Sequence, residues 1–155
     1  MAASPEDWRE WAATDADGLE SAPWSGGPRS KVAEKRAAYG PEAVRRQADL
    51  KRYELRWAVL DPGRGAEMAK TRPVVIVSRD ELNSRLQTVT VCPVTSRLHP
   101  AWRSRLPVRV AGRPGEIAVD QIRTVARARL GKRIGALTVG EAAALRLLIT
   151  EMYGE

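Results

Sequence analysis

Arg72 is the residue whose chemical type and position in the sequence are best suited to hold an anion. It ends a charged turn, and Pro73 leads from it directly into the apolar run Val74–Val77. Proline fixes its own φ and pushes the preceding residue toward extended conformations, so Arg72 is expected at the mouth of a strand. The β-branched run is typical of a strand buried on both faces. A guanidinium held there offers a rigid fork of donors to an anion, whereas the alternative is an arginine that simply ends a strand in solvent.

Positive charge is concentrated in residues 97–133. Ten basic residues stand there against two acidic ones, so the segment has a net charge of +8, compared with +7 for the whole 155-residue chain. Cations that follow a phosphate backbone, together with an aromatic side chain that stacks on a base, are typical of single-stranded nucleic-acid binding. Trp102 supplies such an aromatic group, and the loop 97–102 is predicted to become ordered on its substrate. A solvated basic face with an ordinary hairpin connection is the alternative.

The composition limits which other kinds of site or segment the chain can contain. His99 and Cys92 are the only residues of their kinds, so the sequence predicts neither a disulfide nor a zinc site of recognised spacing, and no metal or cofactor is expected. Cys92 lies in a strand-like run, which favours a buried, inert thiol over a nucleophile. No apolar run reaches membrane-spanning length, and the polar, acidic start is unlike a secretory signal. We therefore expect a cytoplasmic protein without a membrane segment.

Composition also divides the chain into an N-terminal extension, residues 1–51, and a compact domain, residues 52–155. Residues 6–20 carry six acidic residues against Arg9 alone, and Trp8, Trp11 and Trp24 are interspersed in the same region. Residues 28–52 are basic and contain two weak helix starts. The acidic part is too poor in aliphatic residues to fold alone, so we expect a helical or disordered extension.

The pattern of the compact domain predicts short strands and one closing helix. Alternating or continuous apolar residues predict strands over 53–59, 74–77, 88–96 and 106–110, and one or two more over 116–125. A short helical turn is predicted over 80–84 and a chain reversal over 112–115. Thr138 and Glu141 fit a capping box. One apolar helical face then follows, which packs on the sheet: Leu145, Leu148, Ile149 and Met152. Such an arrangement indicates a small, strongly curved sheet or barrel.

Four short motifs, in order and at fitting separations, resemble the MazF/PemK/Kid family of toxin endoribonucleases. They are Asp61-Pro62-Gly63-Arg64-Gly65-Ala66-Glu67 with Thr71-Arg72-Pro73-Val74-Val75, then Pro93-Val94-Thr95-Ser96, then Asp120-Gln121-Ile122-Arg123-Thr124, and finally Arg129-Leu130-Gly131 with Ile134-Gly135-Ala136-Leu137. The resemblance spans about residues 52–155. It implies a mainly β fold, an SH3-like small β-barrel of the PemK/CcdB kind with a C-terminal helix.

The resemblance also implies an activity. Members of this family work as homodimers that cleave single-stranded mRNA at a short motif without a metal, which arrests growth, and a MazE-like antitoxin neutralises them. By position, Arg72 matches the family's catalytic arginine and Thr95 its catalytic threonine. The predicted RNA-binding residues are three that match positions near the RNA groove and three in the adjoining loop: Glu67, Gln121 and Arg123, then Ser96, Arg97 and Trp102. Two positions depart from the family, Ala66 where serine is frequent and Tyr53 where glycine is usual.

The residue types suit this chemistry. In such a reaction the ribose 2′-OH attacks the adjacent phosphate and leaves a 2′,3′-cyclic phosphate and a 5′-OH, so the protein needs no nucleophile of its own. Arg72 can stabilise charge on the phosphoryl oxygens and Thr95 can donate from its hydroxyl. An arginine is a poor general base because it stays protonated at neutral pH. His99 is the other candidate base, although it has no matching role in the family.

Two other functions remain open from the sequence. One is a non-enzymatic, CcdB-like gyrase poison, in which a terminal Trp-Gly-Ile matters, whereas this chain ends Met152-Tyr153-Gly154-Glu155. The other is a basic RNA-binding module without cleavage, an alternative supported by the departure at Ala66. A further hypothesis concerns residues 6–24, whose acidic, tryptophan-containing character suggests an inhibitor acting in cis or a remnant of a fused antitoxin.

Overall fold

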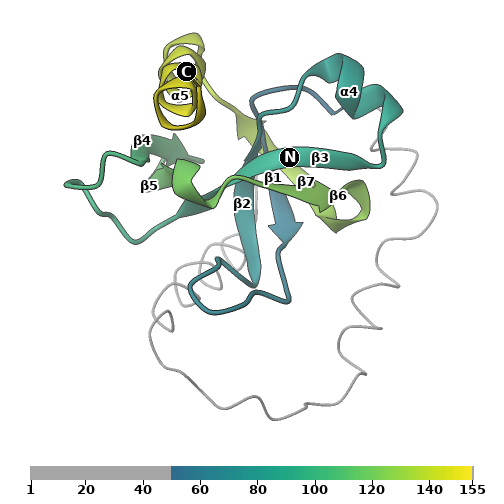
Figure 1. Ribbon diagram of the computed structural model, residues 1–155, viewed down its shortest axis with the longest axis horizontal. Coiled ribbons are helices and arrows are strands. Elements are labelled where there is room, and N and C mark those ends of the chain that lie inside the picture. The colour runs from purple at the N-terminus through teal and green to yellow at the C-terminus, as the bar shows by residue number, and fades with distance from the viewer. Residues whose placement is uncertain (1–49, 155) are drawn as a thin grey trace.

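The computed structural model describes residues 50–154, so the predictions made for residues 1–49 lie outside the described part of the chain. The elements follow one another as β1 (Glu54–Val59), β2 (Thr71–Ile76), α4 (Asp80–Arg85), β3 (Thr88–Thr95), β4 (Arg105–Val110), β5 (Arg113–Ala118), the 3₁₀ turn η3 (Val119–Gln121), β6 (Arg123–Ala126), the 3₁₀ turn η4 (Arg127–Arg129), β7 (Leu130–Ala136) and α5 (Val139–Tyr153) (Figure 1). Among these residues no helix combines the length and the apolar character that crossing a membrane requires.

The long strand β3 organises a single seven-stranded sheet in the order β4-β5-β3-β2-β1-β7. One edge of β3 pairs with β2, and the other edge is shared: β6 pairs with residues 88–91 and β5 with residues 94 and 95. Figure 1 shows β3 crossing the molecule with β6 near one end and the β4–β5 hairpin at the other. Every pairing is antiparallel, and the sheet bends into a half-open barrel beside the C-terminal helix. The predicted mainly β, barrel-like fold class is therefore confirmed.

Both faces of the sheet are buried, as the continuous apolar run predicted. Val75 and Val77 of the β2 segment belong to one hydrophobic cluster, which contains Cys92 and Leu145 as well. Val74 and Ile76 belong to a second cluster on the opposite face, together with residues of β1, β3, β6 and β7: Ala58, Val89, Val91, Val125 and Leu130. Because successive residues of a strand point to opposite faces, β2 is packed on both sides.

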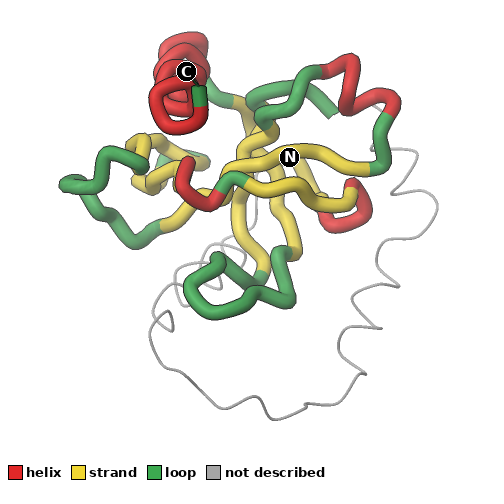
Figure 2. The backbone as a smooth tube through the Cα atoms, in the orientation of Figure 1, coloured by secondary structure: helices red, strands yellow, loops and turns green. Residues whose placement is uncertain are grey.

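Helix α5 confirms the prediction made for the end of the chain. Thr138 Oγ1 accepts a hydrogen bond from the Glu141 backbone N–H at 3.2 Å, and the Glu141 carboxylate accepts from the Thr138 N–H at 2.8 Å. Leu145 is fully buried, and the other three residues of the predicted apolar face pack against the same cluster: Leu148, Ile149 and Met152. Figure 2 shows the helix lying alongside the β4–β5 end of the sheet.

One local prediction was wrong, and pairing between strands explains it. Residues 112–115 were predicted as a turn, but Arg113 already begins β5, and the reversal is confined to Ala111 and Gly112, with φ of 47° and 81°. Positive φ at both central residues is the geometry of a tight two-residue hairpin. Strand β2 begins at Thr71, so Arg72 is its second residue and lies at the mouth of the strand as predicted, opposite Ala58 of β1.

Strand β1 confirms the alternating pattern, but its polar members are buried rather than solvated. The exposed fraction is 6% for Glu54 and 9% for Arg56. The Arg56 Nε atom lies 3.0 Å from one Glu54 carboxylate oxygen, and Arg133 Nε lies 2.6 Å from the other. A buried charge is tolerated when it is paired and hydrogen-bonded in this way.

Candidate functional site

Arg72, Thr95 and Glu116 form a polar row across three neighbouring strands. Thr95 of β3 is the register partner of Glu116 in β5, and on the other side Val74 of β2 is paired with Pro93 of β3. Arg72 lies two residues before Val74 in β2 and Thr95 two residues after Pro93 in β3, so side-chain alternation puts each on the same face as that pair. Opposite residues of an antiparallel pair project from the same face, so the guanidinium, the hydroxyl and the carboxylate share one face of the sheet.

This row is largely covered by the rest of the protein. The exposed fraction is 8% for Arg72, 3% for Thr95 and 2% for Glu116. The Arg72 Nε–H donates to the Ala69 carbonyl at 2.8 Å, which fixes the plane of the guanidinium relative to the preceding loop. The Thr95 hydroxyl oxygen accepts the Arg97 backbone N–H at 3.1 Å. The two predicted catalytic residues thus lie on adjacent strands, each tied to the loop that adjoins its own strand.

The loop over residues 60–70 enters the site from β1. Its ends are joined where the Leu60 N–H donates to the Lys70 carbonyl at 2.9 Å and the Lys70 N–H donates to the Asp61 carboxylate at 2.7 Å. Within the loop, the Glu67 carboxylate accepts the Arg64 N–H at 3.1 Å. Glu67 is exposed, as is Ala66. Glu67, a predicted RNA-binding residue, therefore stabilises the tip of its own loop.

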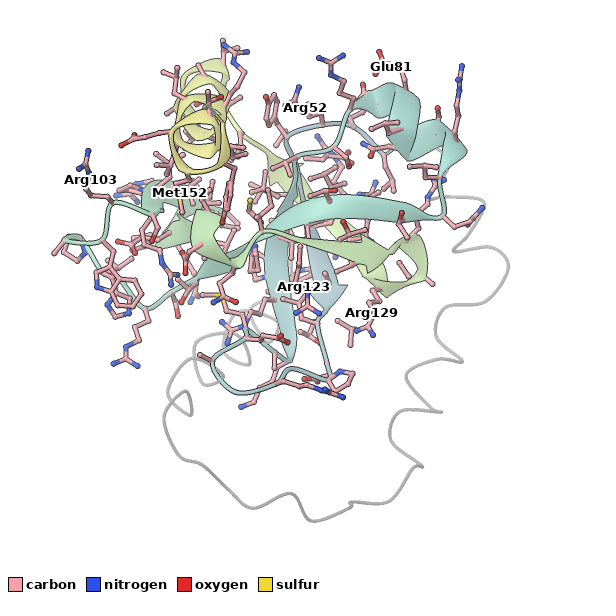
Figure 3. All side chains as sticks on the ribbon, viewed as in Figure 1. Arg52, Glu81, Arg103, Arg123, Arg129 and Met152 are labelled. Atoms are coloured by element: carbon pink, nitrogen blue, oxygen red, sulfur yellow. The ribbon has the colours of Figure 1, made fainter. Side chains whose placement is uncertain are left out.

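Gln121 and Arg123 hold the same loop from the opposite side. The Gln121 side-chain oxygen accepts the Met68 N–H at 3.3 Å, and Arg123 donates to the Met68 carbonyl at 3.3 Å. Arg129 donates to the Val59 carbonyl at 3.1 Å and to the Asp61 carbonyl. Figure 3 shows Arg123 and Arg129 beside this loop. Gln121 and Arg123, both predicted to bind RNA, thus hold the loop that adjoins Arg72 in place.

The second loop, residues 96–104, leaves the site after β3, and Figure 2 shows both loops protruding from the strands. Beyond the Arg97 bond to Thr95, its backbone is held near the middle and at its end. The His99 N–H donates to the Glu116 carboxylate at 2.8 Å, the Trp102 N–H donates to the His99 carbonyl at 2.9 Å, and the Ser104 carbonyl accepts the Val119 N–H at 3.1 Å. The sequence predicted order only on binding, whereas these bonds already fix the loop. Of the predicted contacts in it, Arg97 and Trp102 are exposed and Ser96 is half-buried.

Three flat side chains stack at the end of this loop. The His99 and Trp102 rings lie 4.3 Å apart with an interplanar angle of 16°. The Arg105 guanidinium lies 5.0 Å from the centroid of the Trp102 ring, and its Nε atom is 3.1 Å from an Asp120 carboxylate oxygen. Half of the Trp102 surface is exposed. His99 is therefore engaged through both its ring and its backbone.

Sequence reasoning missed Glu116, which was counted only as one of two acidic residues in the basic segment. The signal that could have found it is the alternation of β5, since Glu116 precedes the buried Ile117 and so faces the side of the sheet opposite to it. The missing information was the register that joins β5 to β3, over a separation of about twenty residues. Within residues 50–154 no group of three or more His, Cys, Asp or Glu side chains is placed to hold a metal ion.

Cys92 fulfils the prediction of an inert thiol. It is free and fully buried on the face opposite to the polar row. Burial, and to a lesser extent the charge of Asp120, raises its pKa to about 12. Burial and the same carboxylate raise the pKa of Tyr153, whose hydroxyl donates to the Val119 carbonyl at 3.1 Å.

Comparison with known proteins identifies the family. The sequence model of the PemK-like, MazF-like toxin of type II toxin–antitoxin systems matches residues 51–153. The endoribonuclease PemK of Escherichia coli is 38% identical over 96 residues, which are 59% of this chain and 72% of that protein. The solved structure of the Mycobacterium tuberculosis toxin MazF-mt6 has a TM-score of 0.55 at 27% identity, over 64% of this chain and 95% of that chain. A MazE–MazF structure from Deinococcus radiodurans shares the fold, with a TM-score of 0.58 at 21% identity over 68% of this chain and 97% of that chain.

A bent antiparallel sheet with a closing helix and a polar row at the start of β2 and the end of β3 places the molecule among MazF-like folds. The chain belongs to the PemK-like, MazF-like toxin family of type II toxin–antitoxin systems. The resemblance drawn from the four sequence motifs is thereby confirmed.

Proposed function

We propose that this protein is an endoribonuclease toxin that cleaves single-stranded RNA, with Arg72 and Thr95 acting on the scissile phosphate. The observation that supports this most directly is the placement of the two residues on adjacent strands and on one face of the sheet. The surrounding charge agrees with an RNA substrate, because residues 50–154 contain nineteen basic and nine acidic residues, a net charge of +10. The family and its endoribonuclease relative support the same reaction.

The reaction proceeds by in-line displacement at phosphorus. The ribose 2′-oxygen forms a bond to the phosphorus as its proton leaves, and the bond from phosphorus to the 5′-oxygen breaks. The products are a 2′,3′-cyclic phosphate and a 5′-OH. Arg72 stabilises the charge on the phosphoryl oxygens and can protonate the departing 5′-oxygen, while Thr95 donates from its hydroxyl. Neither residue needs a metal for these roles. A guanidinium is a poor proton acceptor, so the base that takes the 2′-proton is a different group.

The remaining contacts are assigned to the two loops. Arg97 and Trp102 are exposed beside the end of β3, where a cation can meet the backbone and an aromatic ring can stack on a base. Ser96 adjoins Thr95 and extends the polar surface. Gln121 and Arg123 are assigned to RNA binding as well, and they hold the loop that carries Glu67 and adjoins Arg72.

The family also supports partners and a domain division for this chain. We assign residues 52–155 to the toxin domain and residues 1–51 to an extension. The described domain is proposed to act as a homodimer in the cytoplasm. Its proposed partner is a cognate MazE-like antitoxin that neutralises it, because the family is one of toxin–antitoxin systems. The cleavage motif is proposed to be short and to depend on the loop over residues 96–104.

Purified protein incubated with a long single-stranded RNA in EDTA tests the proposal. Discrete fragments with new 5′-hydroxyl ends are expected from the wild type. R72A should reduce cleavage by at least about 100-fold, the usual loss when one stabilising donor is removed, and T95V should reduce it as well. R146A is the matched control, because Arg146 is an exposed arginine on α5 and should leave the rate unchanged. Intact RNA that the wild type binds without cutting would refute the nuclease and support a binding module.

A further inference from the structure

Glu116 is a buried carboxylate that the proposed chemistry leaves without a role. Its exposed fraction is 2%, lower than that of Arg72 or Thr95 in the same row. Removing a carboxylate from water is costly unless hydrogen bonds compensate for the lost hydration, so an acidic residue at such a position needs a specific partner. The partner here is a backbone N–H of the loop over residues 96–104, that of His99, at 2.8 Å.

Glu116 adds a connection between the Thr95 strand and the middle of the loop over residues 96–104, beyond the bond from the Arg97 N–H to the Thr95 hydroxyl at the start of that loop. Its backbone is the direct register partner of Thr95, so its own place is set by the strand that carries the hydroxyl. Its carboxylate reaches the middle of the adjoining loop, four residues beyond Thr95. The bond from His99 to Glu116 therefore fixes the loop relative to Thr95 itself rather than to a distant part of the fold.

What the loop presents at that point is an aromatic surface. The His99 carbonyl accepts the Trp102 N–H, and the two rings are stacked at 4.3 Å, so a shift of His99 carries the Trp102 ring with it. Arg105 lies against the same ring and is held by Asp120 through an ion pair. The stack is thus anchored at one end by Glu116 and at the other by Asp120. A half-exposed stack held this rigidly can contact a base without the entropic cost of first ordering the loop.

We propose that Glu116 is a positioning residue that sets the distance between the His99–Trp102 stack and Thr95, and so determines which base beside the scissile phosphate is accepted. The proposal rests on the proposed RNA cleavage and names the element that gives that cleavage its sequence preference. Glu116 does not touch the reacting atoms in this role. It acts through a single hydrogen bond on the loop, which holds the stack.

The carboxylate suits this role better than the other residues that could fill the position. A carboxylate accepts strongly from a backbone N–H, and a glutamine oxygen accepts the same bond less strongly. A valine fills a similar part of the strand but leaves the His99 N–H without an acceptor, which costs the desolvation of that group and frees the loop. E116Q should therefore preserve the position of the loop, and E116V should release it.

The test compares cleavage at many sites of one long RNA by the full-length wild type, E116Q and E116V. In E116V the ratio of kcat/KM at the best site to that at a one-base variant of this site should fall by about tenfold, because a loop misplaced by about 1 Å loses such discrimination. E116Q should keep the ratio within about twofold. V110A is the control for lost stability, because Val110 is fully buried at the far end of β4, opposite Arg113 of β5. A ratio between two sites is independent of how much of each preparation is folded.

Hydrogen exchange on the same proteins, without RNA, measures directly whether the bond from His99 to Glu116 protects the loop. The His99 amide should exchange faster in E116V than in the wild type and E116Q, with β2 and β3 unchanged. An unaltered ratio in an active E116V variant, an unaltered His99 amide, or an equal loss of discrimination in V110A would each overturn the role of Glu116. Failure of the wild type to cut any RNA would instead overturn the proposed function and, with it, this role in substrate choice.

Discussion

At the scale of single residues, the site depends on polar groups that the fold buries. Arg72, Thr95 and Glu116 are each less than one-tenth exposed, and each has a hydrogen bond to a nearby backbone group. Those bonds offset the loss of hydration and hold the side chains in one orientation before any substrate arrives. The same burial on the opposite face has a different consequence for Cys92, which has no such partner and behaves as a small apolar residue.

The raised pKa of Cys92 predicts how stability responds to alkaline pH. The thiol titrates near 9.0 when exposed and at about 12 when folded, so its contribution to stability is fully present below about pH 9 and is lost as the pH rises toward 12. Between pH 7 and about pH 10.5 the wild type should lose about 2 kcal/mol more unfolding free energy than C92A does. Urea unfolding at the two pH values measures this difference. Equal losses in both proteins would show that the thiol ionises as easily in the folded state as in the unfolded chain.

At the scale of elements, local patterns were sufficient wherever one element could be judged alone. Alternation predicted β1, β3 and β4, and the Thr138–Glu141 pair predicted the start of α5. Residues 113–115 were assigned to a turn because Arg-Pro-Gly favours reversal locally, yet pairing of β5 with β4 and β3 overrides that preference. The residues that share the polar row with Arg72 show the same limit of local patterns. The resemblance to the family predicted Thr95, whereas Glu116 depended on a register between strands that no local pattern records.

The cap of α5 provides a test at this scale. T138A removes the oxygen that accepts the Glu141 N–H and should lower the unfolding free energy by about 1 kcal/mol, because an orphan donor at the helix start loses its partner. The unfolding midpoint in urea measures the change. T150A is the matched control, since the Thr150 hydroxyl only donates back to the Arg146 carbonyl of the same helix. Equal effects of the two substitutions would argue against a specific contribution from the cap.

At the scale of the whole molecule, charge is distributed very unevenly along the chain. Residues 50–154 have a net charge of +10, whereas residues 6–24 contain six acidic residues and one basic residue, a net charge of −5. The acidic segment also carries three of the five tryptophans. A tethered segment of opposite charge competes with RNA at a high effective concentration, so its inhibition does not depend on strong contacts. This is the physical basis for the hypothesis that residues 6–24 inhibit the domain in cis.

Deletion of residues 1–27 should therefore increase RNA cleavage, and the increase should depend on salt. At about 50 mM salt we expect a gain of about threefold to tenfold, and at about 300 mM most of this gain should disappear, because screening weakens attraction between exposed charges. A full-length variant with the six acidic residues replaced by Asn and Gln separates charge from chain length, and it should match the deletion at both salt concentrations. If the neutralised variant instead behaves like the wild type while the deletion is faster, the effect comes from the tryptophans or from bulk. If all three proteins cut equally fast at low salt, residues 6–24 do not inhibit the site.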